Sequence, residues 1–155
     1  MSSNEILKAK EFFWPVRVYY EDTDSGGVVY YANYLKFMER ARTELLRSIG
    51  YEQDQLQQEW GIIFAVHSAS IQYKKPARFN DELTVVTTIS SLAKASILFK
   101  QSVNLAASHH GAAVNGGLLA DAEIKIACLN AEKFSPQSIP KTIIENIKRE
   151  FYCGS

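Results

Sequence analysis

Residues 19–31 read Tyr-Tyr-Glu-Asp-Thr-Asp-Ser-Gly-Gly-Val-Val-Tyr-Tyr, and they join a predicted strand to a predicted long helix. The strand is expected from Pro15 to Tyr20, where Val16 and Val18 point to one face. The acidic turn and its two glycines place carboxylates next to a helix N-terminus, which carries unpaired N–H groups and positive partial charge. Such a site suits acyl chemistry, in which negative charge develops on a carbonyl oxygen. The same residues also fit an acidic cap on an ordinary helix, so both interpretations stay open here.

The composition is that of an ordinary globular chain. Its 155 residues fit one domain, and 46% of them are hydrophobic, which is enough to build a core. The 17 basic and 17 acidic side chains cancel to a formal net charge of zero. Proteins that bind nucleic acid usually carry a basic excess, so we do not expect nucleic acid as a partner.

Several sequence signals predict the compartment. No apolar run approaches the length of a membrane-spanning helix, and the polar residues 1–10 lack the apolar region of a signal peptide. The two cysteines, Cys128 and Cys153, form neither a disulfide framework nor a metal-binding spacing. These features predict a cytoplasmic protein without a membrane span, in which Cys128 is a small buried apolar residue.

Hydrophobic periodicity predicts one long helix and an antiparallel sheet. From about Tyr31 to Ile49 apolar residues recur at i, i+3 and i+4, and Gly50 supplies a stop. Short links join four later strands, expected over 62–73, 83–92, 96–106 and 118–130, with a loop over 108–117 and a terminal helix over 142–151. The helix must bury its apolar face, and the concave side of the sheet is the surface available, which predicts an α+β fold.

Two sequence motifs carry a family resemblance. Asp22-Thr23-Asp24-x-x-Gly-x-Val-Tyr-Tyr-x-x-Tyr, followed by Phe-x-Glu-Arg-Ala-Arg-x-Glu, resembles the signature of the hotdog-fold 4-hydroxybenzoyl-CoA thioesterase family. Within that family the chain is most similar to the bacterial acyl-CoA thioesterases associated with the Tol–Pal system. The similarity runs over about residues 15–140 and includes the motifs that begin at Lys75 and Lys94. It implies a single hotdog domain over residues 1–155, with an antiparallel β-sheet wrapped around one long α-helix.

The resemblance also implies an activity. Members of this family hydrolyse an acyl-CoA thioester to free acid and coenzyme A, with no metal and no cofactor, since coenzyme A is part of the substrate. The second Asp of the motif, Asp24, would be the catalytic carboxylate, either as nucleophile or as general base. A backbone N–H near Tyr31 would polarise the carbonyl, and the Tyr31 hydroxyl is a further donor. Many relatives carry His at this position, so the mechanism here is expected to depend more on Asp24, whereas Asp22 fits a capping role.

Six further residues are predicted to bind substrate. Two glycines would let the thioester approach the backbone, and a tyrosine would form the pocket wall. A basic pair and a serine would contact the phosphates of coenzyme A, although solvated surface groups remain the alternative for these three. In that order the residues are Gly26, Gly27, Tyr30, Arg78, Lys94 and Ser96.

The resemblance implies partners as well. The family's active sites lie between two subunits, so a homodimer or homotetramer is expected, and acyl carrier protein or an envelope system is a possible further partner. A non-catalytic acyl-binding or envelope-associated scaffold is the alternative function, and a dehydratase on the same fold is a weaker third. The residues leave acyl chain length, aromatic against aliphatic acyl groups, and dimer against tetramer open.

Overall fold

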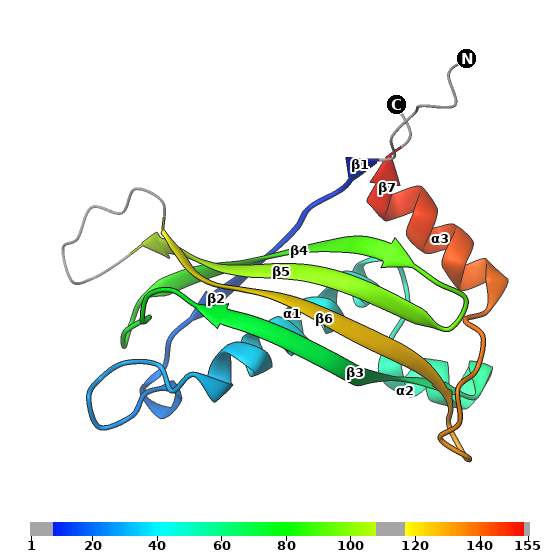
Figure 1. Ribbon diagram of the computed structural model, residues 1–155, viewed down its shortest axis with the longest axis horizontal. Helices are drawn as coiled ribbons and strands as arrows, with labels where there is room; N and C mark the ends of the chain where they lie inside the picture. The colour runs from blue at the N-terminus through cyan, green and yellow to red at the C-terminus, as the bar shows by residue number, and fades with distance from the viewer. Residues whose placement is uncertain (1–7, 108–116, 154–155) are drawn as a thin grey trace.

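The structure, a computed structural model, describes residues 8–107 and 117–153 (Figure 1). Along the chain its elements are β1 (Lys8–Ala9), β2 (Phe12–Arg17), the 3-10 turn η1 (Tyr20–Asp22), α1 (Ala32–Ser48), α2 (Gln53–Gln55), the π-helical turn η2 (Leu56–Trp60), β3 (Ile62–Tyr73), β4 (Glu82–Leu92), β5 (Ser96–Ala107), β6 (Leu118–Asn130), α3 (Lys141–Phe151) and β7 (Tyr152–Cys153).

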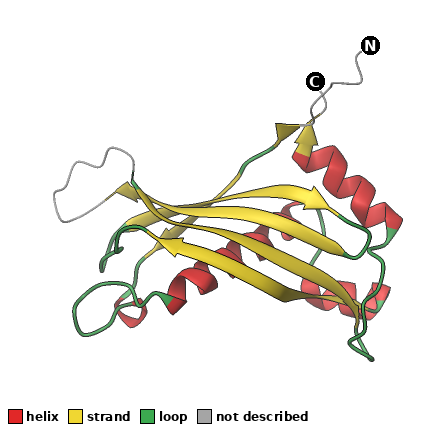
Figure 2. Ribbon diagram, viewed as in Figure 1, coloured by secondary structure: helices red, strands yellow, loops and turns green. Residues whose placement is uncertain are grey.

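Five strands form one antiparallel sheet in the order β2-β4-β5-β6-β3. The long helix α1 lies against one face of this sheet, and α3 lies beside the end of β4 (Figure 2). The short strands β1 and β7 pair separately and bring the two ends of the described chain together. This arrangement, a sheet around one long helix, is the hotdog fold that the family resemblance implies.

The apolar stripe of α1 makes the core. Five residues at the predicted spacing are fully or almost fully buried against the sheet. Burial of a side chain as large as Phe, Met or Leu contributes about 1.5–3 kcal/mol. The five residues are Tyr34, Phe37, Met38, Ala41 and Leu45. Their burial fixes how α1 lies on the sheet and therefore where its N-terminus points.

Most predicted element boundaries agree with the structure. The strands over 62–73 and 118–130 are confirmed at both ends, and the helix expected from Tyr31 to Ile49 is one residue shorter at each end. The strand expected from Pro15 to Tyr20 exists but its bounds are wrong: β2 spans Phe12–Arg17 in register with β4, and the chain then enters η1. The predicted loop over 108–117 lies outside the described residues except for its last position.

One charged residue of α1, Arg42, is buried. Arg42 is 8% exposed, and its Nη1 donates a hydrogen bond to Oε1 of Gln101 at 2.9 Å. Gln101 in turn donates to the Met38 carbonyl and to Oγ1 of Thr87, both at 2.9 Å. Burial lowers the pKa of Arg42 to about 10, so the guanidinium stays charged at neutral pH. This polar network ties α1 to β4 and β5.

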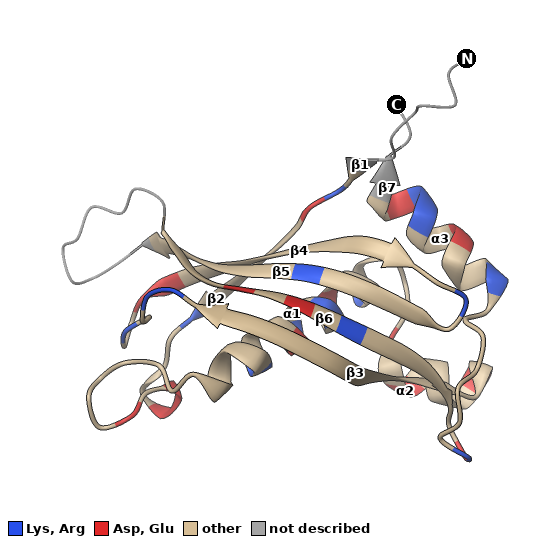
Figure 3. Cartoon of the chain, viewed as in Figure 1, with Lys and Arg blue, Asp and Glu red and all other residues tan. Residues whose placement is uncertain are grey.

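Surface charges of both signs are spread over the strands and helices (Figure 3). Lys100 and Lys125, for example, project from adjacent strands that also carry Glu123. In residues 8–107 and 117–153 no helix combines the length and the apolar character needed to cross a membrane.

The core account predicts unequal effects for two phenylalanines. Phe37→Ala removes a side chain that is 1% exposed and is expected to lower the free energy of unfolding by about 3–5 kcal/mol. Phe13→Ala, at a position that is 58% exposed on β2, is the matched control and is expected to cost much less. Chemical denaturation of both variants measures the difference, and equal losses would contradict the assignment of α1 as the core element.

Candidate active site

The loop between β2 and α1 is held in place by Asp22. Its Oδ2 accepts a hydrogen bond from the Tyr19 N–H at 2.8 Å, which closes η1. Its carbonyl oxygen accepts one from the Tyr30 N–H at 3.1 Å and one from Nδ2 of Asn33 at 2.8 Å. Asp22 therefore holds the backbone of the loop in shape, and its bond with Asn33 joins the loop to the first turn of α1.

Asp24 is oriented by the glycines that follow it. The Gly26 N–H donates to Oδ1 of Asp24 at 2.9 Å, and the Gly27 N–H donates to the Asp24 carbonyl at 3.0 Å. Gly27 has a φ of +78°, which favours glycine, and a Cβ on Gly26 would lie 3.3 Å from Asp24 Oδ1. The two glycines thus shape the turn that presents the carboxylate.

The link between β3 and β4 packs on the same loop. The Val29 N–H donates to the Ala77 carbonyl at 2.8 Å, and the Phe79 N–H donates to the Gly27 carbonyl at 3.2 Å. Between these two bonds Arg78 forms a β-bridge with Val28. The fold therefore brings Arg78 beside the Asp24 turn, with an exposed side chain.

Asp24 lines a cavity of about 430 Å³. The cavity lies between the loop, the start of α1 and the end of β3, and four tyrosines line it. Asp24 is the one carboxylate among the described residues around it, which are Asp24, Val28, Val29, Tyr30, Tyr31, Tyr34, Tyr73, Lys74, Lys75 and Pro76.

The tyrosine rings of this cavity pack on one another. Tyr31 stacks on Tyr30 with ring centroids 5.1 Å apart and lies 5.4 Å from Tyr73, which lies 5.6 Å from Tyr34. The Tyr34 hydroxyl accepts a hydrogen bond from the Ala77 N–H at 2.9 Å. Burial raises the pKa of both Tyr34 and Tyr73, so these phenols are neutral at pH 7 and cannot serve as bases. Asp24 is the carboxylate that lines the cavity with these neutral phenols.

The N-terminus of α1 reaches the cavity at Tyr31. The helix begins at the next residue, Ala32, so the Tyr31 N–H lies at the positive end of the helix dipole. Within the described chain no acceptor is paired with this N–H. A free donor at a helix N-terminus, close to a carboxylate, suits a carbonyl oxygen on which charge develops.

Comparison with known proteins agrees with this geometry. Residues 26–112 match the Thioesterase superfamily. The chain belongs to this family. It is 41% identical over 138 residues to the acyl-CoA thioester hydrolase YbgC of Escherichia coli O6:H1 (89% of this chain, 96% of the relative) and 42% identical over 132 residues to the acyl-CoA thioesterase YbgC of Haemophilus influenzae (85% and 90%).

Solved structures of the thioesterase family are also similar. A probable thioesterase from Bartonella henselae superposes with a TM-score of 0.73 at 34% identity, covering 84% of this chain and 99% of that one. A mutant 4-hydroxybenzoyl CoA thioesterase complexed with 4-hydroxybenzoyl CoA superposes with a TM-score of 0.79 at 22% identity, covering 89% and 99%. At 22% identity, the similarity to the 4-hydroxybenzoyl CoA thioesterase is a similarity of fold.

The Asp24 cavity also contains residues that the sequence analysis did not assign to the site. Tyr73 ends β3, Lys74 and Lys75 follow it, and all three line the cavity. The Lys-Lys pair before Pro76 was the available signal, because adjacent cations at the end of a strand suit an anionic ligand. In the described residues, no cluster of three or more His, Cys, Asp or Glu side chains could hold a metal ion.

Two predicted binding residues lie far from Asp24 in the same chain. Lys94 is in the turn between β4 and β5, and Ser96 is the first residue of β5. Arg78 precedes β4, whose 11 residues extend roughly 35 Å at about 3.3 Å per residue. One chain therefore places Arg78 near Asp24 and places Lys94 and Ser96 at the opposite end of the sheet (Figure 1).

Asp22, which fixes the loop, and Asp24, which lines the cavity, are expected to respond differently to substitution. Asp22→Ala removes the acceptor of the Tyr19 N–H and is expected to lower the free energy of unfolding by about 1 kcal/mol. Asp22→Asn retains an acceptor oxygen, so it is expected to keep most of the parent's stability and turnover. Thermal unfolding and steady-state rates of both variants test this. Loss of turnover in Asp22→Asn at full stability would instead make Asp22 part of the chemistry.

Proposed function

We propose that this protein is an acyl-CoA thioesterase that hydrolyses its substrate to free carboxylic acid and coenzyme A, with Asp24 as the catalytic carboxylate. One observation carries the assignment. Asp24 and Tyr31 line the same cavity, and the Tyr31 N–H has no acceptor among the described residues. The relatives named acyl-CoA thioester hydrolase, at 41% identity over most of the chain, support the substrate class.

The proposed chemistry uses the two groups in sequence. The thioester carbonyl oxygen accepts a hydrogen bond from the Tyr31 N–H. By analogy with other oxyanion donors, this bond stabilises the transition state by about 3 kcal/mol. Asp24 then either attacks the carbonyl carbon or removes a proton from an attacking water. The C–S bond breaks, the acyl carbon gains the water oxygen, and the sulfur leaves as the thiol of coenzyme A.

Binding of the coenzyme A phosphates is assigned to basic residues around the cavity. Lys74 and Lys75 line it, and Arg78 lies beside the Asp24 turn. Lys94 and Ser96 can reach the same substrate only if they come from a second subunit, since they lie at the far end of their own sheet. Gly26, Gly27 and Tyr30 complete the proposed site.

A homodimer follows from the same reasoning. β3 pairs only with β6 in the described sheet, which leaves a 12-residue edge strand with an open row of backbone groups. Val66 on β3 and Leu35 on α1 are 56% and 40% exposed beside this edge. We therefore expect the sheet to continue across two copies, with each site built from both. A tetramer, an acyl carrier protein or envelope-system partner and a cytoplasmic location remain predictions.

Removal of the Asp24 charge tests the assignment. Asp24→Asn keeps the size of the side chain but loses its basicity, and kcat is expected to fall at least about 100-fold with the fold intact. Asp54→Asn, at an exposed position on α2, is the matched control and should leave kcat unchanged. A thiol-release assay across short, long and aromatic acyl-CoAs provides the rates. Parent-like hydrolysis by Asp24→Asn would refute its role, and a parent that binds acyl-CoA without hydrolysing it would favour the scaffold alternative.

Removal of the Lys94 charge tests coenzyme recognition. Lys94→Ala is expected to raise KM for acyl-CoA with little change in kcat, because a phosphate contact is equally strong in the ground and transition states. The KM for the acyl-pantetheine fragment, which lacks the nucleotide phosphates, should not change. Lys133→Ala, at an exposed turn position, is the control. An unchanged KM in Lys94→Ala would remove that residue from the site.

A further inference from the structure

Tyr34 brings a buried hydroxyl group to the Asp24 cavity. The residue is 3% exposed, and it lines the cavity together with Asp24 and Tyr31. The centroid of its ring lies 5.6 Å from that of Tyr73 and 6.2 Å from that of Phe37. Rings on both sides therefore hold the Tyr34 side chain in place, and the direction of its hydroxyl is fixed before a ligand binds.

The Tyr34 hydroxyl has one partner and one unused proton. Its oxygen accepts a hydrogen bond from the Ala77 N–H at 2.9 Å, and no described residue accepts a hydrogen bond from its O–H. A buried donor without an acceptor costs about 1–3 kcal/mol. A ligand atom that enters the cavity and accepts this hydrogen bond removes that cost, so the free proton favours a ligand with an acceptor close to Tyr34.

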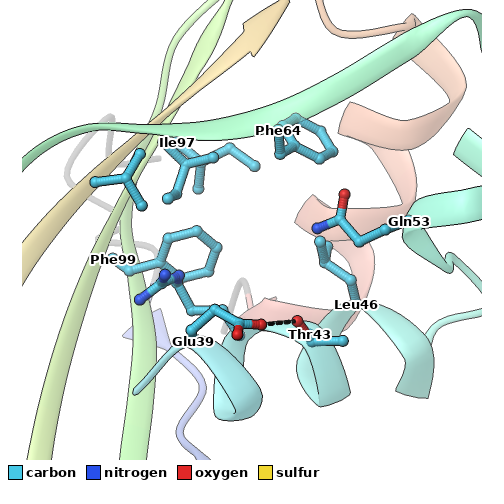
Figure 4. A pocket seen from close by; sticks show the side chains of 10 residues that line it. Glu39, Thr43, Leu46, Gln53, Phe64, Ile97 and Phe99 are labelled. Atoms are coloured by element: carbon cyan, nitrogen blue, oxygen red, sulfur yellow. Dashed lines mark hydrogen bonds between the residues drawn. The ribbon is translucent and has the colours of Figure 1, made fainter. Parts of the chain in front are cut away.

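The helix α1 borders a second cavity, and Tyr34 is not among the residues around it. That cavity, of about 290 Å³, lies between the later turns of α1 and the sheet, where Glu39, Thr43 and Leu46 line it (Figure 4). The free proton of Tyr34 therefore serves a ligand at the Asp24 site and not one that binds further along the helix.

The Tyr34 hydroxyl lies close to the start of α1. Tyr34 follows Tyr31 by three residues, so the two share one face of the helix and are about 4.5 Å apart along its axis. Side chains on a helix lean toward its N-terminus. The contacts agree, because Ala77, which bonds to the hydroxyl, also accepts a hydrogen bond from the Val29 N–H at 2.8 Å, two residues before Tyr31. The Tyr34 O–H and the Tyr31 N–H thus reach the cavity at the same end of α1.

We propose that Tyr34 is a catalytic residue whose hydroxyl donates a second hydrogen bond to the thioester carbonyl oxygen, beside the bond from the Tyr31 N–H. This inference rests on the proposed thioesterase function and adds a donor to it. Both bonds strengthen as negative charge develops on the oxygen, and the proton stays on the phenol throughout. Burial raises the pKa of Tyr34, so the phenol keeps its proton at neutral pH and acts as a donor.

Removal of the hydroxyl tests the assignment. Tyr34→Phe keeps the ring and is expected to lower kcat about 100-fold with little change in KM, because the bond is stronger in the transition state than in the ground state. Tyr51→Phe is the matched control, since it removes another buried hydroxyl, which bonds to Asn146 outside the Asp24 cavity, and it should leave kcat unchanged. Equal kcat values for Tyr34→Phe and an active parent would overturn the inference and leave the thioesterase assignment standing. A parent that hydrolyses no acyl-CoA would refute the proposed function itself.

A more acidic phenol separates the donor role from a structural one, because Tyr34→Phe also removes the acceptor of the Ala77 N–H. Replacement of Tyr34 by 3,5-difluorotyrosine keeps the hydroxyl and lowers its pKa. The phenolate formed at high pH still accepts from the Ala77 N–H but cannot donate, so kcat is expected to decline at a lower pH than in the parent. The other ionisable groups around the hydroxyl are the same in both proteins, and they are Tyr73, Asp81, Asp24, Lys74 and Lys75. The same alkaline limit in both proteins would overturn the inference.

Discussion

The hydrogen bonds that fix the loop over residues 22–29 are the interactions on which the rest of the site depends. The loop belongs to no named strand, so hydrogen bonds place the Asp24 carboxylate. The Asp22 carbonyl accepts from the Tyr30 N–H and from Asn33 Nδ2, and the Ala77 carbonyl accepts from the Val29 N–H. Burial of the α1 stripe holds the helix N-terminus on the other side. Asp24 and the Tyr31 N–H are thereby positioned before any substrate binds, which avoids paying for reorganisation during the reaction.

Much of the fold and part of the site could be predicted from the sequence because the signals are local. The spacing of Phe37, Met38 and Ala41 determines one face of a helix, and alternation determines β3. The division between a capping Asp22 and a reactive Asp24 followed from capping chemistry and the family motif. The predicted capping of the long helix by Asp22 is wrong, because α1 has no side-chain cap and the Asp22 carboxylate instead closes the 3-10 turn η1. The role of Asp24 stays a prediction.

The features that the sequence did not reveal depend on residues distant along the chain. Arg42 is buried because Gln101, 59 positions away, accepts its hydrogen bond. Tyr73 joins the site only where the end of β3 meets the start of α1, through its hydroxyl, which donates to the Tyr31 carbonyl at 3.3 Å. β2 was misplaced because its limits are set by pairing with β4. Lys94 and Ser96 are the extreme case, since their predicted role requires a second chain.

The Tyr31 N–H can be tested directly, although it belongs to the backbone. Tyr31 has a φ of −64°, which proline adopts without strain, and proline has no N–H. Tyr31→Ala loses the ring but keeps the donor, so the rate difference between Tyr31→Pro and Tyr31→Ala isolates the N–H. With equal melting temperatures, kcat of Tyr31→Pro should be at least about 100-fold below that of Tyr31→Ala. Equal kcat values would contradict the claim that the α1 N-terminus polarises the thioester.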